Sequence, residues 1–148
     1  MNVLKLLSGR AELSASIDPS SHSVSLVDVR REDFPLIYVN RGFESLTGYS
    51  PSEVVGRNCR LLQGEATNAE TVALMREAIA AGMPFIADLT NYKKSGEAFW
   101  NRLSLRPVRN ESGVVTHYVG IQSDITAMKR VEEKVCDFAL ELGRFPNT

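Results

Sequence analysis

The stretch that decides the fold is FIADLTNYKKSGEAFWNRLSLRPVRNESGVVTHYVGIQSD, residues 85–124. Its β-branched, aromatic and other apolar residues predict three strands, over residues 85–92, 98–109 and 114–124. The two segments between them, residues 94–97 and 110–113, carry the glycine, serine and asparagine that hairpin turns use. This half of the chain therefore predicts a three-stranded antiparallel meander.

The residues before the meander predict two further strands and several short helices. Residues 24–29 alternate as a strand does, and residues 36–39 follow Pro35 as a second strand. Helix starts are indicated at Asn40, at Ser50 with Pro51 and Glu53, and at the capping box of residues 67–70. The last of these opens a helix with Val72, Met75 and Ile79 on one face and Gly82 past its end. Strands at both ends with helices between them predict an α+β domain built on an antiparallel sheet.

Both ends of the chain favour helices outside this core. We expect an N-terminal helical cap over residues 1–18, a core over 19–125 and a C-terminal amphipathic helix over 126–148. The last helix carries an apolar stripe of Met128, Val131, Val135, Phe138 and Leu142. Two uses of the stripe remain open, a coiled-coil dimer and docking on the chain's own sheet. We favour a homodimer through the flanking helices and the outer sheet face, which is itself too apolar to face water alone.

Composition excludes several classes of protein. The chain has 148 residues, and its 17 Lys and Arg balance 18 Asp and Glu to a net charge of -1, which argues against nucleic acid as a partner. Its apolar runs are far shorter than the roughly 20 residues of a membrane span, so no membrane partner is expected. Two cysteines, Cys59 and Cys136, make no disulfide framework and favour the cytoplasm. No metal site is expected, because no second cysteine or histidine lies near Cys59 at ligand spacing.

Three amide side chains fall on one face of the predicted meander. If Lys93 pairs with Phe99, Asn91 lies opposite Asn101. If Arg109 pairs with Val114, Asn101 lies opposite Gln122. An unpartnered buried amide costs on the order of 1–3 kcal/mol, so a row of three needs partners. Either the amides bond one another or water, or they match a heterocycle edge with both donors and acceptors.

The segment GRNCRLLQ, residues 56–63, places a single thiol between an amide and arginines. Such a cysteine is either a small buried hydrophobe or a thiol whose pKa the cationic neighbours lower. The segment resembles the GRNCRFLQ hallmark of LOV domains, the flavin-binding blue-light photoreceptor branch of the PAS fold, with Leu61 in place of the phenylalanine. The resemblance extends over residues 23–125 and includes LTGYS at 46–50, NYKKSG at 91–96, FWN at 99–101 and GIQ at 120–122.

The resemblance implies a PAS fold, a five-stranded antiparallel sheet with short helices packed on one face, and FMN as the cofactor. It implies a short LOV photoreceptor without an effector domain, and not an enzyme. Cys59 matches the cysteine whose sulfur adds reversibly to flavin C4a in blue light, and Gln122 matches the glutamine near flavin N5 and O4. Asn58 and Gln63 match flavin contacts, and Arg60 and Arg76 match the arginines that bind the phosphate. Asn91 and Asn101 match the residues that bond the pyrimidine edge. The apolar walls are expected from Val27, Ile79, Leu89, Leu103, Leu105 and Gly120.

The resemblance also implies how the domain signals. When N5 changes from acceptor to donor, the Gln122 amide is expected to reorient on the last strand, directly before the terminal helix. The downstream signalling protein is unknown. The alternatives are a flavin-based redox sensor or small flavoprotein without physiological photochemistry, and a PAS interaction module without flavin. Leu61 is expected to loosen packing near the flavin and to alter the adduct lifetime.

Overall fold

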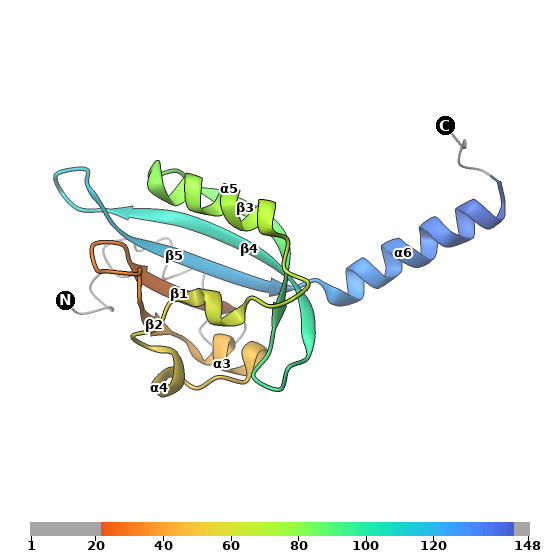
Figure 1. The fold of residues 1–148 in the computed structure, drawn as a ribbon, viewed down its shortest axis with the longest axis horizontal. Coiled ribbons are helices and arrows are strands. Elements are labelled where there is room, and N and C mark those ends of the chain that lie inside the picture. The colour runs from red at the N-terminus through yellow and green to blue at the C-terminus, as the bar shows by residue number, and fades with distance from the viewer. Residues whose placement is uncertain (1–21, 144–148) are drawn as a thin grey trace.

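The computed structural model describes residues 22–143, so the helical cap predicted over residues 1–18 lies outside the described residues. A five-stranded antiparallel sheet has the strand order β2-β1-β5-β4-β3 (Figure 1). The strands are β1 (Ser23–Asp28), β2 (Leu36–Val39), β3 (Phe85–Tyr92), β4 (Ala98–Arg109) and β5 (Val115–Asp124). The helices are α3 (Arg41–Thr47), α4 (Pro51–Val54), the 3-10 helix η1 (Cys59–Leu62), α5 (Ala69–Ala80) and α6 (Thr126–Glu141). The predicted α+β class and the five-stranded sheet are confirmed.

The short helices begin at their predicted capping residues, except that the N-cap of α5 is one residue later than predicted. The Asn40 side chain accepts from the backbone N–H of Phe43 at the start of α3, and Glu53 accepts from the N–H of Ser50 at α4. At α5 the cap is Asn68, which accepts from the N–H of Thr71, and not Thr67. The Thr67 hydroxyl instead donates to the Thr90 carbonyl of β3 and fastens the preceding loop to the sheet.

The hairpin registers differ from the predicted ones by two residues. In the β3–β4 ladder Asn91 pairs with Phe99, and Leu89 pairs with Asn101. In the β4–β5 ladder Leu103 pairs with Gln122. The first hairpin closes at Lys93 and Glu97, with Gly96 at a φ of 92°, a left-handed conformation that suits glycine in a short loop. The second hairpin has a similar loop and a bulge between Val108 and Arg109. A shift of two residues preserves the sheet face, so the three amides still share a face but do not lie directly opposite one another.

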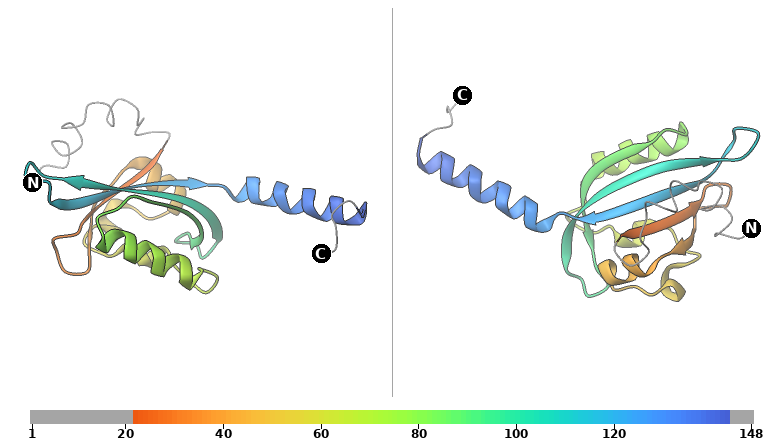
Figure 2. Two further views of the ribbon diagram at one scale, coloured as in Figure 1. Left: turned by 90° about the horizontal axis from the view of Figure 1, so that it is seen from above. Right: turned by 180° about the vertical axis from the view of Figure 1, so that it is seen from behind.

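The two faces of the sheet have different coverings. The inner face carries α3, η1 and α5, and its core contains Leu36, Val39, Phe43, Val54 and Leu62. On the outer face Val24, Leu26 and Val119 form a second buried cluster. Helix α6 leaves the end of β5 and extends away from the sheet (Figure 2). Of the two open uses of its apolar stripe, docking on the chain's own sheet is not seen here, because Val131, Val135 and Phe138 are 59–62% exposed.

Candidate functional site

A cavity of about 500 Å³ lies between the inner face of the sheet and the helices. This volume falls within the range of about 300–1,000 Å³ that small-molecule and cofactor sites occupy. Every residue predicted to contact the cofactor lines it, apart from Gly120: Val27, Asn58, Cys59, Arg60, Gln63, Arg76, Ile79, Leu89, Asn91, Asn101, Leu103, Leu105 and Gln122. The structure thus brings together residues that lie far apart in the sequence. Their individual roles toward a cofactor remain predictions.

Cys59 begins the 3-10 helix η1 and packs against the core beside Leu62. Asn58 caps this helix, because its Oδ1 accepts from the N–H of Arg60 at 2.8 Å, and its Nδ2 donates to the Asp33 carbonyl at 2.7 Å. Burial raises the pKa of the Cys59 thiol to about 12. The pKa lowering that neighbouring arginines suggested is therefore wrong: at neutral pH Cys59 is a protonated thiol.

Two arginines, Arg60 and Arg76, line the cavity. The Arg60 guanidinium donates from both terminal nitrogens to the Asp33 carboxylate, and this bidentate pair holds the pKa of Asp33 below its usual range. Arg76 comes from α5 and is exposed, and it forms no ion pair with another residue in the described part of the chain. A phosphate group would fit this pair of cations.

Three amides stand on the sheet side of the cavity, and all are buried. The Nδ2 of Asn101 donates to the Oδ1 of Asn91 at 2.9 Å, across a diagonal of the ladder. Gln122 bonds two serines of β1: Ser23 Oγ donates to its Oε1 at 2.6 Å, and its Nε2 donates to Ser25 Oγ at 2.7 Å. Within the described residues no buried side-chain nitrogen or oxygen lacks a partner. The protein itself thus gives each amide a partner, through the asparagine pair and through the serines of β1, and each amide keeps capacity for another bond.

Sequence reasoning missed several residues of the cavity. Ser25 lines it, and so do Asp33 and Phe34, both in the loop between β1 and β2 with φ of 63° and 46°. These positive φ values gave no sequence signal, although aspartate tolerates them better than most residues. Gly120 does not line the cavity, yet a Cβ there would lie 2.6 Å from Ser25 Oγ. The same Cβ would meet Gln122 and Leu105, both in the lining, so Gly120 lies on the cavity side of β5, and its contact with a cofactor stays a prediction.

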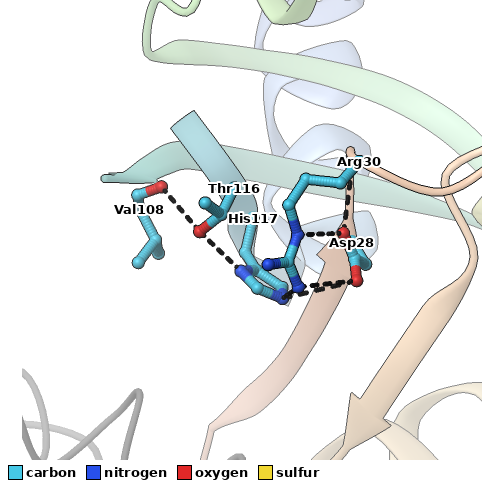
Figure 3. Close-up of polar contacts among 5 residues, drawn as sticks. All are labelled: Asp28, Arg30, Val108, Thr116 and His117. Carbon is cyan, nitrogen blue, oxygen red and sulfur yellow. Dashed lines mark hydrogen bonds and ion pairs between the residues drawn. The ribbon is translucent and has the colours of Figure 1, made fainter. Parts of the chain in front are cut away.

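The outer face holds a separate buried polar cluster, shown in Figure 3. Arg30 makes a bidentate pair with Asp28, and its Nη2 lies 3.5 Å from Nε2 of His117. Because a guanidinium can only donate, Nε2 is the accepting nitrogen, and Nδ1 donates to Thr116 Oγ1 at 2.8 Å. Burial lowers the pKa of His117, and the neighbouring Arg30 charge acts in the same direction, against the charge of Asp28. His117 is therefore a neutral, structural histidine. No group of acidic, histidine and cysteine side chains suited to a metal ion occurs among residues 22–143.

The base of α6 is fastened to β4. The N–H of Trp100 donates to Thr126 Oγ1, and the Trp100 carbonyl accepts from the N–H of Ile125, both at 2.9 Å. Lys129 lies over the Trp100 ring, 5.0 Å from its centroid, and 3.4 Å from Asp88. Trp100 is the chain neighbour of Asn101, so the helix base and the polar wall of the cavity meet at adjacent positions of one strand.

Comparison with known proteins identifies the family. A family model described as a PAS domain matches residues 23–127. The LOV domain of a blue-light activated histidine kinase from Erythrobacter litoralis superimposes with a TM-score of 0.69 and is 44% identical; the match covers 71% of this chain and 96% of that one. The chain belongs to the LOV family of PAS domains. Five of the eight motif residues of this LOV domain line the cavity: Asn58, Cys59, Arg60, Leu62 and Gln63.

Other similar proteins contain the LOV domain within longer chains. A blue-light-activated histidine kinase of Rhizobium johnstonii is 44% identical over 124 residues, which are 83% of this chain and 36% of the relative. A structure described as an RNA-binding Light-Oxygen-Voltage receptor has a TM-score of 0.78 at 38% identity and covers 94% of this chain and 40% of that one. The chain therefore spans about a third of the length of the Rhizobium kinase.

The donor set of the cavity fits a flavin, the chromophore that membership of the LOV family implies. The lining combines apolar side chains, which a flat aromatic ring system requires, with the three amides on the sheet side. The two arginines and the free thiol of Cys59 belong to the same lining, so an anionic group and a reactive ring carbon would each have a matching side chain.

Proposed function

We propose that this LOV domain is a blue-light sensor that binds FMN in the cavity and uses Cys59 as its photoreactive thiol. The observation that carries the proposal is a cavity lined by a protonated thiol, three amides and two arginines together. Each of these groups has a matching part on FMN: the reactive ring carbon, the pyrimidine edge and the phosphate.

A thiol with a raised pKa suits this chemistry. When bound, the photoexcited flavin supplies an electrophilic carbon and a neighbouring nitrogen that takes up a proton. Cys59 would contribute both its sulfur and its proton to the bound flavin, so no outside oxidant or reductant would be consumed. Since the reverse step in darkness restores thiol and flavin, the domain acts as a sensor and turns over no substrate.

The arginines favour FMN over riboflavin as the occupant. Arg60 and Arg76 can make charge-assisted bonds to a phosphate, and those bonds are stronger and more directional than neutral ones. Arg60 already holds the Asp33 carboxylate in this structure, so it is oriented for an oxyanion at the cavity.

The output is proposed to pass through α6 to a second copy of the chain. The apolar stripe of the helix is exposed along its length, as a helix that meets a partner helix presents it. Flanking residues 1–18 and the outer sheet face are proposed to contribute to the same homodimer. The downstream protein remains unknown; the Rhizobium relative is a histidine kinase, which makes a kinase partner or kinase domain the first class to test.

The cytoplasm is the proposed location, because the mechanism needs a free thiol, which a reducing compartment preserves. None of the helices among residues 22–143 has the length and apolar character to cross a membrane.

One absorbance experiment tests the function. The purified protein is expected to be yellow, to lose its flavin band in blue light and to regain it in darkness. Cys59→Ala should keep the flavin and lose the reversible bleaching. Cys136→Ser, at an exposed thiol far along α6, should behave as wild type. A Cys59→Ala protein that still bleaches reversibly would contradict the assignment, and dark turnover of an electron donor would favour the redox alternative.

A further inference from the structure

The partners of Gln122 differ in kind from those of the other two amides. Its Oε1 accepts from Ser23 Oγ and its Nε2 donates to Ser25 Oγ, and both serines are buried, at 5% and 3% exposure. A hydroxyl can donate or accept. If the amide turns by 180°, Nε2 can donate to Ser23 and Oε1 can accept from Ser25, so both bonds are kept.

Asn101 and Asn91 have no such freedom. Asn101 Oδ1 accepts from the backbone N–H of Ser123 at 3.2 Å, and Asn91 Nδ2 donates to the backbone carbonyl of Thr90 at 3.2 Å. A backbone N–H can only donate and a carbonyl can only accept, so each asparagine loses a bond if it turns. The bond between Asn101 and Asn91 locks the pair further, because a reversed Asn101 would place its oxygen against the oxygen of Asn91.

The space around Ser25 and the Gln122 amide is narrow, and Gly120 is what keeps it open. A Cβ at Gly120 would lie 2.6 Å from Ser25 Oγ and 2.9 Å from Gln122 Nε2, so glycine allows the strands to place these groups together. Ser25 itself lines the cavity, next to Gln122 on the same face.

We propose that Ser23 and Ser25 are positioning residues that stabilise the Gln122 amide in either of two orientations, which makes it the one reversible amide of the three. The orientation is then set by whatever stands at this edge of the cavity, since the protein partners accept both. This inference rests on the proposed function for the change that reverses the amide. The serine inference adds that the turn of the Gln122 amide is transmitted to β1, because Ser23 and Ser25 must then exchange their donor and acceptor roles.

Nuclear magnetic resonance of the flavin-loaded protein tests the inference through the side-chain amide protons. In darkness the Gln122 Nε2 protons should show Overhauser contacts to the β-protons of Ser25, and under blue light to those of Ser23. The amide protons of Asn91 and Asn101 should keep their contacts in both states. Gln122 contacts that stay with Ser25 in the light, or a reversal at either asparagine, would overturn the inference.

Variants provide a second readout, the exchange of the Gln122 amide protons with water in darkness. The double substitution Ser23→Ala and Ser25→Ala removes both partners and should speed this exchange about tenfold. Ser104→Ala, on the outer face of β4, is the matched control and should leave it unchanged. Ser23→Thr in the Ser25 wild-type background keeps the hydroxyl and should retain slow exchange. Unchanged exchange in the double variant would overturn the role of the serines.

Bleaching in the same samples separates this inference from the proposed function. If the wild type does not bleach reversibly, the proposed function fails, and the inference fails with it. If it bleaches while the Gln122 contacts do not move, only the serine inference fails.

Discussion

Asn101 donates to Asn91 at 2.9 Å although the two residues are not opposite each other in the β3–β4 ladder. The bond crosses a diagonal, and the Oδ1 of Asn101 accepts in turn from the N–H of Ser123 in β5. One buried side chain therefore connects three strands at the polar edge of the cavity. Its removal should affect both the sheet and the site.

Asn101→Leu should destabilise the flavin-free protein and weaken FMN binding. The substitution leaves the buried Asn91 oxygen and the Ser123 N–H without their partner, which costs about 1–3 kcal/mol. Urea unfolding measures the stability, and titration with FMN measures the affinity. Ser104→Ala in the same strand should leave both nearly unchanged. An Asn101→Leu protein as stable as wild type would contradict this structural role of the Asn101 side chain.

The raised pKa of Cys59 predicts that its thiol is alkylated slowly in the dark. At pH 8 a thiol with a pKa of about 12 has roughly a thousandfold less thiolate than one at the ordinary value of 9.0. Alkylation by iodoacetamide, followed by mass spectrometry in the Cys136→Ser and Cys59→Ala variants, compares the two cysteines. Cys136, which is exposed, should react first by a wide margin. Equal rates in the flavin-free protein would show that burial does not protect Cys59.

The arginines should distinguish FMN from riboflavin. Arg60→Ala and Arg76→Ala should each weaken FMN binding by about tenfold or more, because each removes a charge-assisted bond to the phosphate. Neither should weaken riboflavin binding to the same degree. Arg57→Ala, within the motif but outside the cavity lining, is the control. Equal losses for both flavins would indicate that the arginines act on the fold and not on the phosphate.

Much of this site can be predicted from the sequence, and the part that cannot has a physical reason. Strand faces follow from the two-residue period, so Asn91, Asn101 and Gln122 are assigned to one face correctly even though both predicted registers are two residues off. Register depends on loop geometry, and Gly96 and Gly113 close shorter loops than expected. The serine partners of Gln122 lie 97 and 99 residues away along the chain, and no local pattern specifies such a pairing.

Of the two alternatives for Cys59, the lowered thiol pKa is wrong for a related reason, and the buried thiol is right. Proximity in sequence to Arg57 and Arg60 suggests a positive environment. In the fold, Arg60 is paired with Asp33, and the thiol packs among apolar side chains, so burial outweighs charge.

His117 predicts a pH dependence of stability. Its folded pKa is lowered, so between that value and the ordinary pKa of about 6.5 the unfolded chain binds more protons than the folded one. The contribution of neutral His117 is therefore complete above pH 6.5 and falls as the pH drops below it. Urea midpoints measured from pH 7.5 to 5 should fall more steeply for wild type than for His117→Gln, and parallel curves would contradict the assignment.

The apolar stripe of α6 predicts how the domain associates. Val135→Glu or Phe138→Glu should convert a dimer to a monomer in light scattering, since either buries a charge in the proposed helix interface. Cys136→Glu adds the same charge beside the stripe and should have a smaller effect. The predicted dimer would be wrong if the wild type were monomeric in both darkness and light.

The position of α6 also has a mechanical consequence. Its 16 residues make a rod about 24 Å long, at about 1.5 Å per residue. Among residues 22–143, the hydrogen bonds and ion pairs that join the rod to the sheet lie at its base, where Trp100 bonds Ile125 and Thr126 and Lys129 pairs with Asp88. A tilt of about 10° at that base would displace the far end by about 4 Å, most of a helical turn. In the proposed homodimer, helix α6 would act as a lever, because an adjustment of hydrogen-bond size beside Asn101 would become a movement large enough to change which side chains meet on the partner.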